Sequence, residues 1–308
     1  MSERTVADHE TVAEVEGLTR RFGRTTLALD NVSLRVPKGS VFGLVGENGA
    51  GKTTLIKHLL GQYKPQSGTV RVFGESPIEA PEKVLAGIGY LSEDHDLPGW
   101  MRIDELINYT QAFYPDWDDT YAEHLLKTFE LQPEAKIKTL SRGQRAQAGL
   151  LTALAHRPPL LLLDEPSAGL DAVVRRDILG AVIRTVADEG RTVLFSSHLL
   201  DEVERVADYI AMISKGKLVL CDSLDAIKAK HHSLTLHVEQ PWTKPPTVPG
   251  ALAVTGGGRD WTVVTDGRIE EARTAIRTLG ATILEETTPS LEDIFVARSG
   301  RRSILEEG

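Results

Sequence analysis

Apolar residues along the chain follow two spacings, one typical of strands and one typical of helices. "VSLRVPKG" (32–39) alternates as a half-buried strand does, and Val12, Val15 and Leu18 indicate an edge strand before it. "SVFGLVG", "PLLLLDEP" and "RTVLFSSH" carry near-continuous apolar runs of strand length. Such runs are typical of parallel strands that are buried on both faces of a sheet.

Helical spacing separates these strands. Leu55, Leu59 and Leu60 in "KTTLIKHLLG" recur at helical intervals, and we expect this helix to stop at Gly61. A second helical stretch, "AVVRRDILGAVIRTVADEG", lies between two of the apolar runs. This order of strand, helix and strand predicts an open parallel α/β sheet, with the alternating strands forming an antiparallel edge sheet.

Two regions differ from that pattern and set the expected domains. Amphipathic helices at about 95–140 predict a helical subdomain within a main domain over 1–230. Short strands and helices after a proline-rich stretch predict a small α+β domain over 231–308, which we expect to be regulatory or dimerising. We expect His231 and His232 to belong to the linker, because no Cys/His spacing typical of a metal site accompanies them.

Composition narrows the possible functions. The 308 residues carry a formal net charge of −9, which argues against a dedicated nucleic-acid binder. Cys221 is the single cysteine, so no intrachain disulfide can form, and we expect it to be a small buried residue. The opening residues are polar, and the longest uninterrupted leucine run covers 160–163, far short of a bilayer span. We expect a cytoplasmic chain that does not cross a membrane by itself.

The stretch "GENGAGKTT" (46–54) is the first candidate site. It fits the pattern GxxxxGK[ST], and it lies between a predicted buried strand and a predicted helix, as a phosphate-binding loop requires. Glycines let backbone N–H groups converge on phosphate oxygens at a helix N-terminus. Lys52 would then bridge the β- and γ-phosphates of ATP, and the Thr53 hydroxyl would bind Mg²⁺. The alternative is a flexible glycine-rich turn.

Two adjacent acids end the apolar run of "LLLLDEP". Asp164 would hold the Mg²⁺ ion, and Glu165 would act as the general base that polarises the attacking water. The alternative is a pair of strand-end acids that face solvent.

The remaining motifs give the chain a family resemblance. "TLSRGQRAQAGL" resembles the signature motif of ABC-type ATPases, and the glycine loop, "LDEP", "SAGLD" and "FSSH" complete the family's set in the expected order. The resemblance covers about 12–230. It implies the P-loop NTPase fold of an ABC-ATPase domain, with ATP and Mg²⁺ as cofactors. It also implies ATP sites that are composed from two subunits.

The resemblance assigns roles to individual residues. Ser141 and Gly143 would face the γ-phosphate held by a second subunit, Asp171 would lie across the dimer interface, and His198 would contact the γ-phosphate of its own subunit. Phe22 in "RRFG" stands where an aromatic ring stacks on adenine. The complete nucleotide-binding set implied is Phe22, Gly46, Glu47, Asn48, Gly49, Ala50, Gly51, Lys52, Thr53, Thr54, Ser141, Gly143, Gln144 and Asp171.

The chain departs from the family pattern at two positions. Arg142 replaces the first glycine of the signature motif, and Glu93 in "IGYLSED" replaces a glutamine that commonly contributes to the metal site. A carboxylate at position 93 still offers oxygen to Mg²⁺, although it adds negative charge beside ATP.

Comparison within the family favours a transporter subunit. Only about ninety residues separate Lys52 from Ser141, which excludes the relatives with long inserted coiled coils. "PSLEDIF" (289–295) resembles the tail of ATP-binding subunits from the multidrug and polysaccharide exporter branch. The resemblance therefore implies a homodimer, or a heterodimer with a second ATPase subunit, bound at the inner face of the cell membrane to a separate membrane-spanning permease. The alternative is a soluble ABC ATPase that remodels a protein or nucleoprotein.

An exposed docking surface for that permease is expected near "LPGWM" (97–101). Trp100 and Met101 offer large apolar area directly after Glu93, and the following helical segment adds Ile103 and Tyr109. Leu106 and Ile107 in the same segment are further candidates. The alternative is that these side chains fill the core of the helical subdomain.

Overall fold

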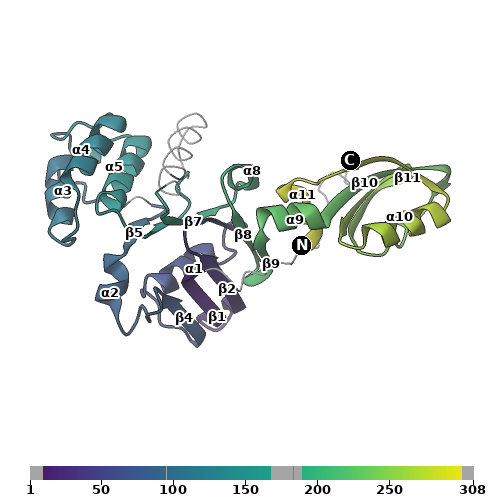
Figure 1. Cartoon of the computed structure of the whole chain (residues 1–308), viewed down its shortest axis with the longest axis horizontal. Helices are drawn as coiled ribbons and strands as arrows, with labels where there is room; N and C mark the ends of the chain where they lie inside the picture. Colours follow the sequence, from purple (N-terminus) through teal and green to yellow (C-terminus); the bar gives the residue numbers. More distant parts are fainter. Residues whose placement is uncertain (1–9, 95, 168–182, 184–188, 300–308) are drawn as a thin grey trace. The chain divides into compact units, whose positions relative to one another are not determined.

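The computed structural model describes residues 10–94, 96–167, 183 and 189–299 (Figure 1). The chain divides into two compact units, Met1–Cys221 and Asp222–Gly308.

A six-stranded sheet forms the centre of the first unit, in the strand order β5-β6-β7-β3-β8-β9. Its strands are β3 (Val41–Val45), β5 (Ile88–Leu91), β6 (Leu160–Leu163), β7 (Thr192–Ser197), β8 (Tyr209–Ser214) and β9 (Lys217–Ser223). The pairs from β5 through β6, β7 and β3 to β8 are all parallel. Every residue of β3, β6 and β7 is buried, as the near-continuous apolar runs predicted.

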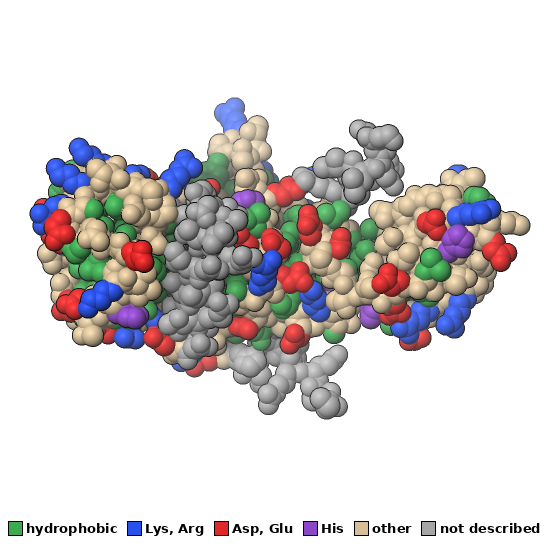
Figure 2. Space-filling view, turned by 90° about the horizontal axis from the view of Figure 1, so that it is seen from above, with side chains coloured by type: hydrophobic (Ala, Val, Ile, Leu, Met, Phe, Trp, Pro, Cys, Tyr) green, Lys and Arg blue, Asp and Glu red, His purple; other side chains and the backbone are tan. Residues whose placement is uncertain are grey.

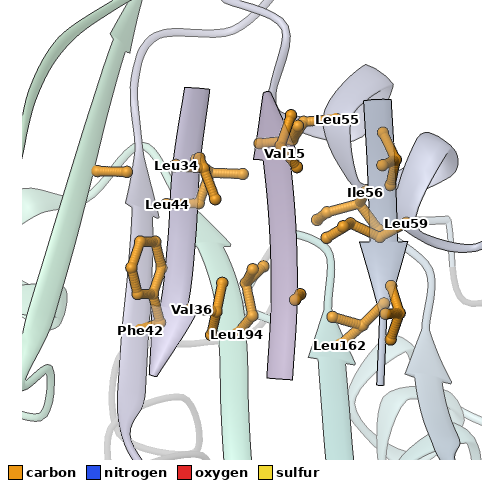
Figure 3. Close-up of a cluster of buried hydrophobic side chains, with 14 of the residues drawn as sticks. Val15, Leu34, Val36, Phe42, Leu44, Leu55, Ile56, Leu59, Leu162 and Leu194 are labelled. Carbon is orange, nitrogen blue, oxygen red and sulfur yellow. The ribbon is translucent and has the colours of Figure 1, made fainter. Parts of the chain in front are cut away.

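A three-stranded antiparallel sheet packs near the central sheet, in the order β2-β1-β4. Its strands are β1 (Thr11–Phe22), β2 (Thr26–Pro37) and β4 (Ser67–Val72). Helix α1 (Lys52–Leu59) contributes Leu55, Ile56 and Leu59 to the core that both sheets share (Figure 3). The predicted antiparallel edge sheet is confirmed, and this common core fixes the glycine loop between β3 and α1.

Helices make up the subdomain between β5 and β6. They are α3 (Ile103–Gln111), α4 (Asp119–Thr128), a 3₁₀ turn at Ile137–Thr139 and α5 (Arg142–Leu154). The side chain of Asp118 caps α4 by accepting a hydrogen bond from the Tyr121 N–H, and Ser141 caps α5 in the same way. The short helices α2 (Pro81–Ala86) and α8 (Leu200–Glu204) complete the described helices of this unit. The helix expected over 172–190 lies largely outside the described residues.

The second unit contains a three-stranded antiparallel sheet in the order β11-β10-β12. Its elements are α9 (Leu224–Lys230), β10 (His231–Trp242), β11 (Ala251–Asp266), α10 (Ile269–Thr278), β12 (Ala281–Thr287) and α11 (Leu291–Ser299). Leu234, Leu236, Trp261 and Ile276 form the centre of its own hydrophobic core. The two short strands expected within 251–266 are one strand, β11.

The expectation that His231 lies in a linker was wrong. His231 begins β10 and is fully buried, with Nδ1 bonded to the Ile227 carbonyl at 2.7 Å and Nε2 accepting from Arg298 Nε at 3.2 Å. Burial lowers the pKa of His231, and its Nε2 accepts from Arg298, which also pairs with Asp266. No local pattern indicated this cluster, because its members come from separate elements.

The expectation that Cys221 is buried was wrong. Cys221 is exposed, because it lies on β9 near the edge of the central sheet. Leu291, Ile294 and Phe295 of the "PSLEDIF" stretch are buried in α11, so these side chains pack within the protein.

None of the described helices combines the length and the apolar character that crossing a bilayer requires.

Candidate active site

The glycine loop runs directly from β3 into α1, and its backbone approaches neighbouring chain so closely that side chains are excluded. A Cβ atom at Gly46 would lie 2.3 Å from the Ile213 carbonyl oxygen, and one at Gly51 would lie 2.4 Å from the carbonyl oxygen of Ala28. Gly51 also has a φ of 114°, which L side chains rarely adopt. Local folding therefore requires glycine at both positions.

The start of α1 is suited to an anion. Gly51 occupies the N-cap position and provides no side-chain cap, and the first turn contains no acidic residue. The N–H groups of this turn have no intrahelical acceptors, and the helix dipole adds partial positive charge. Lys52, the first residue of α1, donates hydrogen bonds from Nζ to the carbonyl oxygens of Gly46 (2.5 Å) and Glu47 (3.1 Å). The ammonium group of Lys52 is therefore held by the backbone of the glycine loop.

A buried ion pair connects the loop to the end of β6. Lys52 Nζ lies 2.9 Å from Glu165 Oε1, and both side chains are about 5% exposed. The other carboxylate oxygen of Glu165, Oε2, lies 2.9 Å from His198 Nδ1. The three residues predicted to be catalytic, Lys52, Glu165 and His198, therefore form one continuous chain of contacts.

Ser196 on β7 joins the two adjacent acids. Its hydroxyl donates to Asp164 Oδ1 at 2.7 Å and accepts a hydrogen bond from the Glu165 N–H at 2.8 Å. Glu165 has a φ of 45°, a left-handed conformation that is uncommon for residues other than glycine and that clusters at functional sites. Sequence reasoning missed Ser196; the available signal was a hydroxyl residue within a strand that is otherwise apolar and buried.

The Asp164 carboxylate fits a Mg²⁺ ion. Asp164 is fully buried, and its Oδ2 has no hydrogen-bond partner in the described part of the chain. Burial raises the pKa of Asp164, and the Ser196 and Thr53 hydroxyls lower it in part. The chain supplies few ligands of its own, because no group of three or more His, Cys, Asp or Glu among the described residues could hold a metal ion. Mg²⁺ in nucleotide sites commonly takes one or two carboxylates and completes its shell with phosphate oxygens and water.

Glu93 lies near enough to these acids to interact with them. Burial raises the pKa of Glu93, and the negative charges of Asp164 and Glu165 raise it further, whereas Lys52 lowers it. The structure therefore brings the carboxylate at position 93 into the electrostatic environment of the glycine loop.

The other predicted residues lie on separate elements. Phe22 ends β1 and packs edge-to-face on Tyr63, with ring centroids 5.6 Å apart. Ser141 and Gln144 form a reciprocal capping pair at the start of α5, where the Ser141 N–H donates to Gln144 Oε1 and the Gln144 N–H donates to Ser141 Oγ. Gly143 and the exposed Arg142 belong to the same helical turn. Asp171 lies outside the described residues.

Comparison with known proteins agrees with this geometry. The family model described as "ABC transporter" matches residues 29–168. The chain is 30% identical to the ABC transporter ATP-binding protein YtrB of Bacillus subtilis (strain 168), over 88% of this chain and 93% of that protein. It is 31% identical to the daunorubicin/doxorubicin resistance ATP-binding protein DrrA of Streptomyces peucetius, over 93% of this chain and 92% of that protein.

A solved structure extends the likeness to the fold. The dimeric ATP-binding cassette MJ0796, in a post-hydrolysis state with ADP and Pi, superposes with a TM-score of 0.62 at 22% identity, over 69% of this chain and 98% of that one. The chain belongs to the ATP-binding proteins of ABC transporters. It is an ATP-binding, ATP-hydrolysing subunit with the P-loop fold of that family.

Substitution of Ser196 tests the link between the two acids. Ser196→Ala leaves the buried Glu165 N–H without its acceptor, so the free energy of unfolding should fall by about 1–3 kcal/mol. ATP turnover should fall by about 10- to 100-fold, as for other residues that orient a metal-binding carboxylate. Steady-state hydrolysis and urea denaturation measure the two effects. Ser197→Ala is the matched control, because its hydroxyl accepts from the Leu199 N–H rather than from the Glu165 N–H; equal turnover in both variants would contradict a role for Ser196.

Proposed function

We propose that this chain hydrolyses Mg-ATP at sites composed from two subunits and thereby powers export through a separate membrane-spanning subunit. The observation that carries the proposal is the chain of contacts from the buried Lys52–Glu165 pair to the exposed His198, at the edge of the sheet where the glycine loop begins. It joins a phosphate-binding lysine to a carboxylate and an imidazole, which are the groups that positioning and activation of a water require.

The glycine loop and the start of α1 bind the phosphates in this proposal. The backbone N–H groups over 46–54 face the phosphate oxygens, and Lys52 neutralises the β- and γ-phosphates. Thr53, Asp164 and Glu93 hold Mg²⁺, directly or through water. The ion, when bound, screens the negative charge that builds up on the transferred phosphoryl group.

Glu165 is the general base in this proposal. In the structure its carboxylate is engaged by Lys52 on one oxygen and by His198 on the other. Triphosphate in the loop competes for Lys52, and the exchange frees Oε1 to accept a proton from the attacking water. His198, which is 41% exposed, keeps Oε2 oriented and contacts the γ-phosphate.

The second half of each site comes from a partner subunit. Ser141 and Gly143 sit at the uncovered N-terminus of α5, where a hydroxyl and a backbone N–H suit the γ-phosphate held by another copy. Gln144 stabilises the backbone conformation of this turn through its reciprocal hydrogen bonds with Ser141. Asp171 is assigned to the same interface by the family pattern.

Replacement of Glu165 tests the general base. Glu165→Gln keeps the shape of the side chain but removes its basicity, so turnover should fall by about 10²-fold or more while ATP binding persists. ATP should also hold the variant as a stable dimer, because hydrolysis no longer separates the subunits. Single-turnover hydrolysis, equilibrium nucleotide binding and size-exclusion chromatography give the three readouts. Turnover above half of the wild-type value would exclude Glu165 as the base.

Mixing two inactive variants tests the composite site. Lys52→Ala removes the phosphate contact from one subunit, and Ser141→Arg blocks the contact that the other subunit provides. Each variant alone should be inactive, whereas an equimolar mixture should regain part of the wild-type turnover because a heterodimer holds one intact site. Lys52→Ala mixed with Lys52→Arg is the control and should stay inactive. Robust activity of either variant by itself contradicts the two-subunit arrangement.

The relatives support transport over soluble remodelling. YtrB carries the name of an ABC transporter ATP-binding protein, DrrA is named for drug resistance, and BcrA of Enterococcus faecalis for bacitracin transport. We infer from them that the partner is a membrane-spanning permease and that this chain lies against it at the inner face of the membrane.

The second unit, for which we propose a regulatory or dimerising role, carries none of the phosphate-binding motifs. On the face drawn in Figure 2, acidic and basic side chains are interspersed.

The candidate docking surface divides into exposed and buried residues. Trp100 is 73% exposed and Tyr109 is 55% exposed, whereas Met101, Ile103 and Leu106 are buried. Met101 and Leu106 pack with Ile137 in the core of the helical subdomain, which was the alternative interpretation for the aliphatic residues. The proposed permease contact therefore rests on Trp100, with Tyr109 of α3 beside the ring of Phe113.

Removal of the Trp100 ring tests this contact. Trp100→Ala should weaken binding of the membrane-spanning subunit by about 2 kcal/mol, the scale of an interface anchor, and should leave basal ATP hydrolysis and thermal stability unchanged. Co-purification of the permease beside a soluble ATPase assay provides the measurement. Leu284→Ala, which truncates an exposed apolar side chain of the second unit, is the matched control. Undiminished co-purification of the Trp100 variant would move the docking surface elsewhere.

A further inference from the structure

A cluster of rings and a guanidinium surrounds Phe22. The Arg20 guanidinium carbon lies over the Phe22 ring and over the Tyr63 ring, 4.8 Å from each centroid. The two rings also meet edge-to-face, with centroids 5.6 Å apart. Arg20 and Tyr63 thus both pack against the Phe22 ring.

Contacts with the rings, rather than hydrogen bonds alone, hold Arg20 in place. Nη1 of Arg20 donates to the Lys64 carbonyl at 3.3 Å, whereas Nε is buried without a hydrogen-bond partner in the described part of the chain. A planar guanidinium stacks on aromatic faces in a way that an ammonium group does not. The position of Arg20 is therefore set by Phe22 and Tyr63 together.

The backbone next to Phe22 is fixed by Gln66. Its side-chain carbonyl accepts from the Arg21 N–H at 2.6 Å, and its amide donates to the Arg21 carbonyl at 3.1 Å. Both bonds tie the last residues of β1 to the loop between α1 and β4. The orientation and the position of the Phe22 ring therefore depend on that loop.

The same loop is connected to the helix that begins with Lys52. The His58 ring packs on Tyr63 with centroids 5.6 Å apart, and Nδ1 of His58 donates to the Thr54 carbonyl at 2.7 Å. Burial lowers the pKa of His58, the hydrogen bond to the Thr54 carbonyl raises it in part, and the charge of Arg20 lowers it. A continuous path of packed side chains joins Phe22 through Tyr63 and His58 to α1.

We propose that Arg20, Tyr63 and Gln66 are positioning residues for the nucleotide base. They hold the Phe22 ring in place relative to α1, so that adenine stacks on the ring while the phosphates occupy the start of α1. This inference rests on the proposed function in one respect, the assignment of Phe22 to adenine stacking. It adds three residues that contact no phosphate and that act only through the base.

A role limited to stabilising the sheet makes a different prediction from a role in positioning. Loss of stability weakens every ligand of the folded site alike, whereas loss of positioning weakens only ligands that carry a base. ATP and inorganic tripolyphosphate, each with Mg²⁺, separate the two cases because both can occupy the glycine loop and only ATP reaches Phe22.

The experiment measures binding of both ligands by titration calorimetry to the full-length chain and its variants. Phe22→Ala should weaken ATP binding by about tenfold or more, the scale of one base–aromatic stack. Arg20→Ala and Gln66→Ala should each weaken it by about three- to tenfold, and Arg20→Lys should recover only part of the loss. Tripolyphosphate affinity should change less than twofold in all of them, and hydrolysis should show a raised KM with a similar kcat.

Arg21→Ala is the matched control, because it removes the same charge from the adjacent residue while Gln66 binds only the Arg21 backbone. If the Arg20 and Gln66 variants bind ATP as tightly as this control does, the positioning role is excluded. Parallel losses of ATP and tripolyphosphate assign the cluster to stability alone and also exclude it. If Phe22→Ala itself binds ATP normally, the adenine assignment fails and the inference fails with it, while the Lys52 and Glu165 results remain separate evidence on the ATPase site. Tyr63→Leu provides a second route to the same comparison should Arg20→Ala fold poorly.

Discussion

The ion pair between Lys52 and Glu165 is the interaction on which the rest of the site depends. Both side chains are almost completely buried, and an unpaired charge in such surroundings costs several kcal/mol. The pair therefore requires that Lys52, the first residue of α1, and Glu165, the second residue after β6, meet. That meeting is possible only because β3 and β6 both pair with β7 in parallel, so their carboxyl ends reach the same edge of the sheet.

Three carboxylates lie close to Lys52. Asp164 and Glu93 lie in the same field as Glu165, and the pKa of each is raised by burial and by the neighbouring carboxylates. In the proposed site, Mg-ATP would bring a divalent ion to these acids and phosphates to Lys52, and would so offset the charges that the fold places together.

The other predicted nucleotide-binding residues lie on elements away from this edge of the central sheet. The capping pair of Ser141 and Gln144 fixes a helix start that carries Arg142 and Gly143, and it does so without using a charge. The cluster of Arg20, Phe22 and Tyr63 lies on the antiparallel sheet, which shares its core with α1. The proposed phosphate contacts and the proposed adenine stack would therefore both rest on elements that share one hydrophobic core.

The sequence by itself determined the elements and motifs that depend on local spacing. Continuous apolar runs predicted β3, β6 and β7, and the glycine loop predicted the start of α1, because burial and backbone freedom are properties of neighbouring residues. Tertiary structure alone decided which distant residues meet. Ser196 between the two acids, Arg20 between two rings, and His231 buried beside Arg298 belong to this class. The physical reason is that these contacts arise from strand order and helix packing, which join residues far apart in the chain, whereas periodicity reports only on the face that each residue presents.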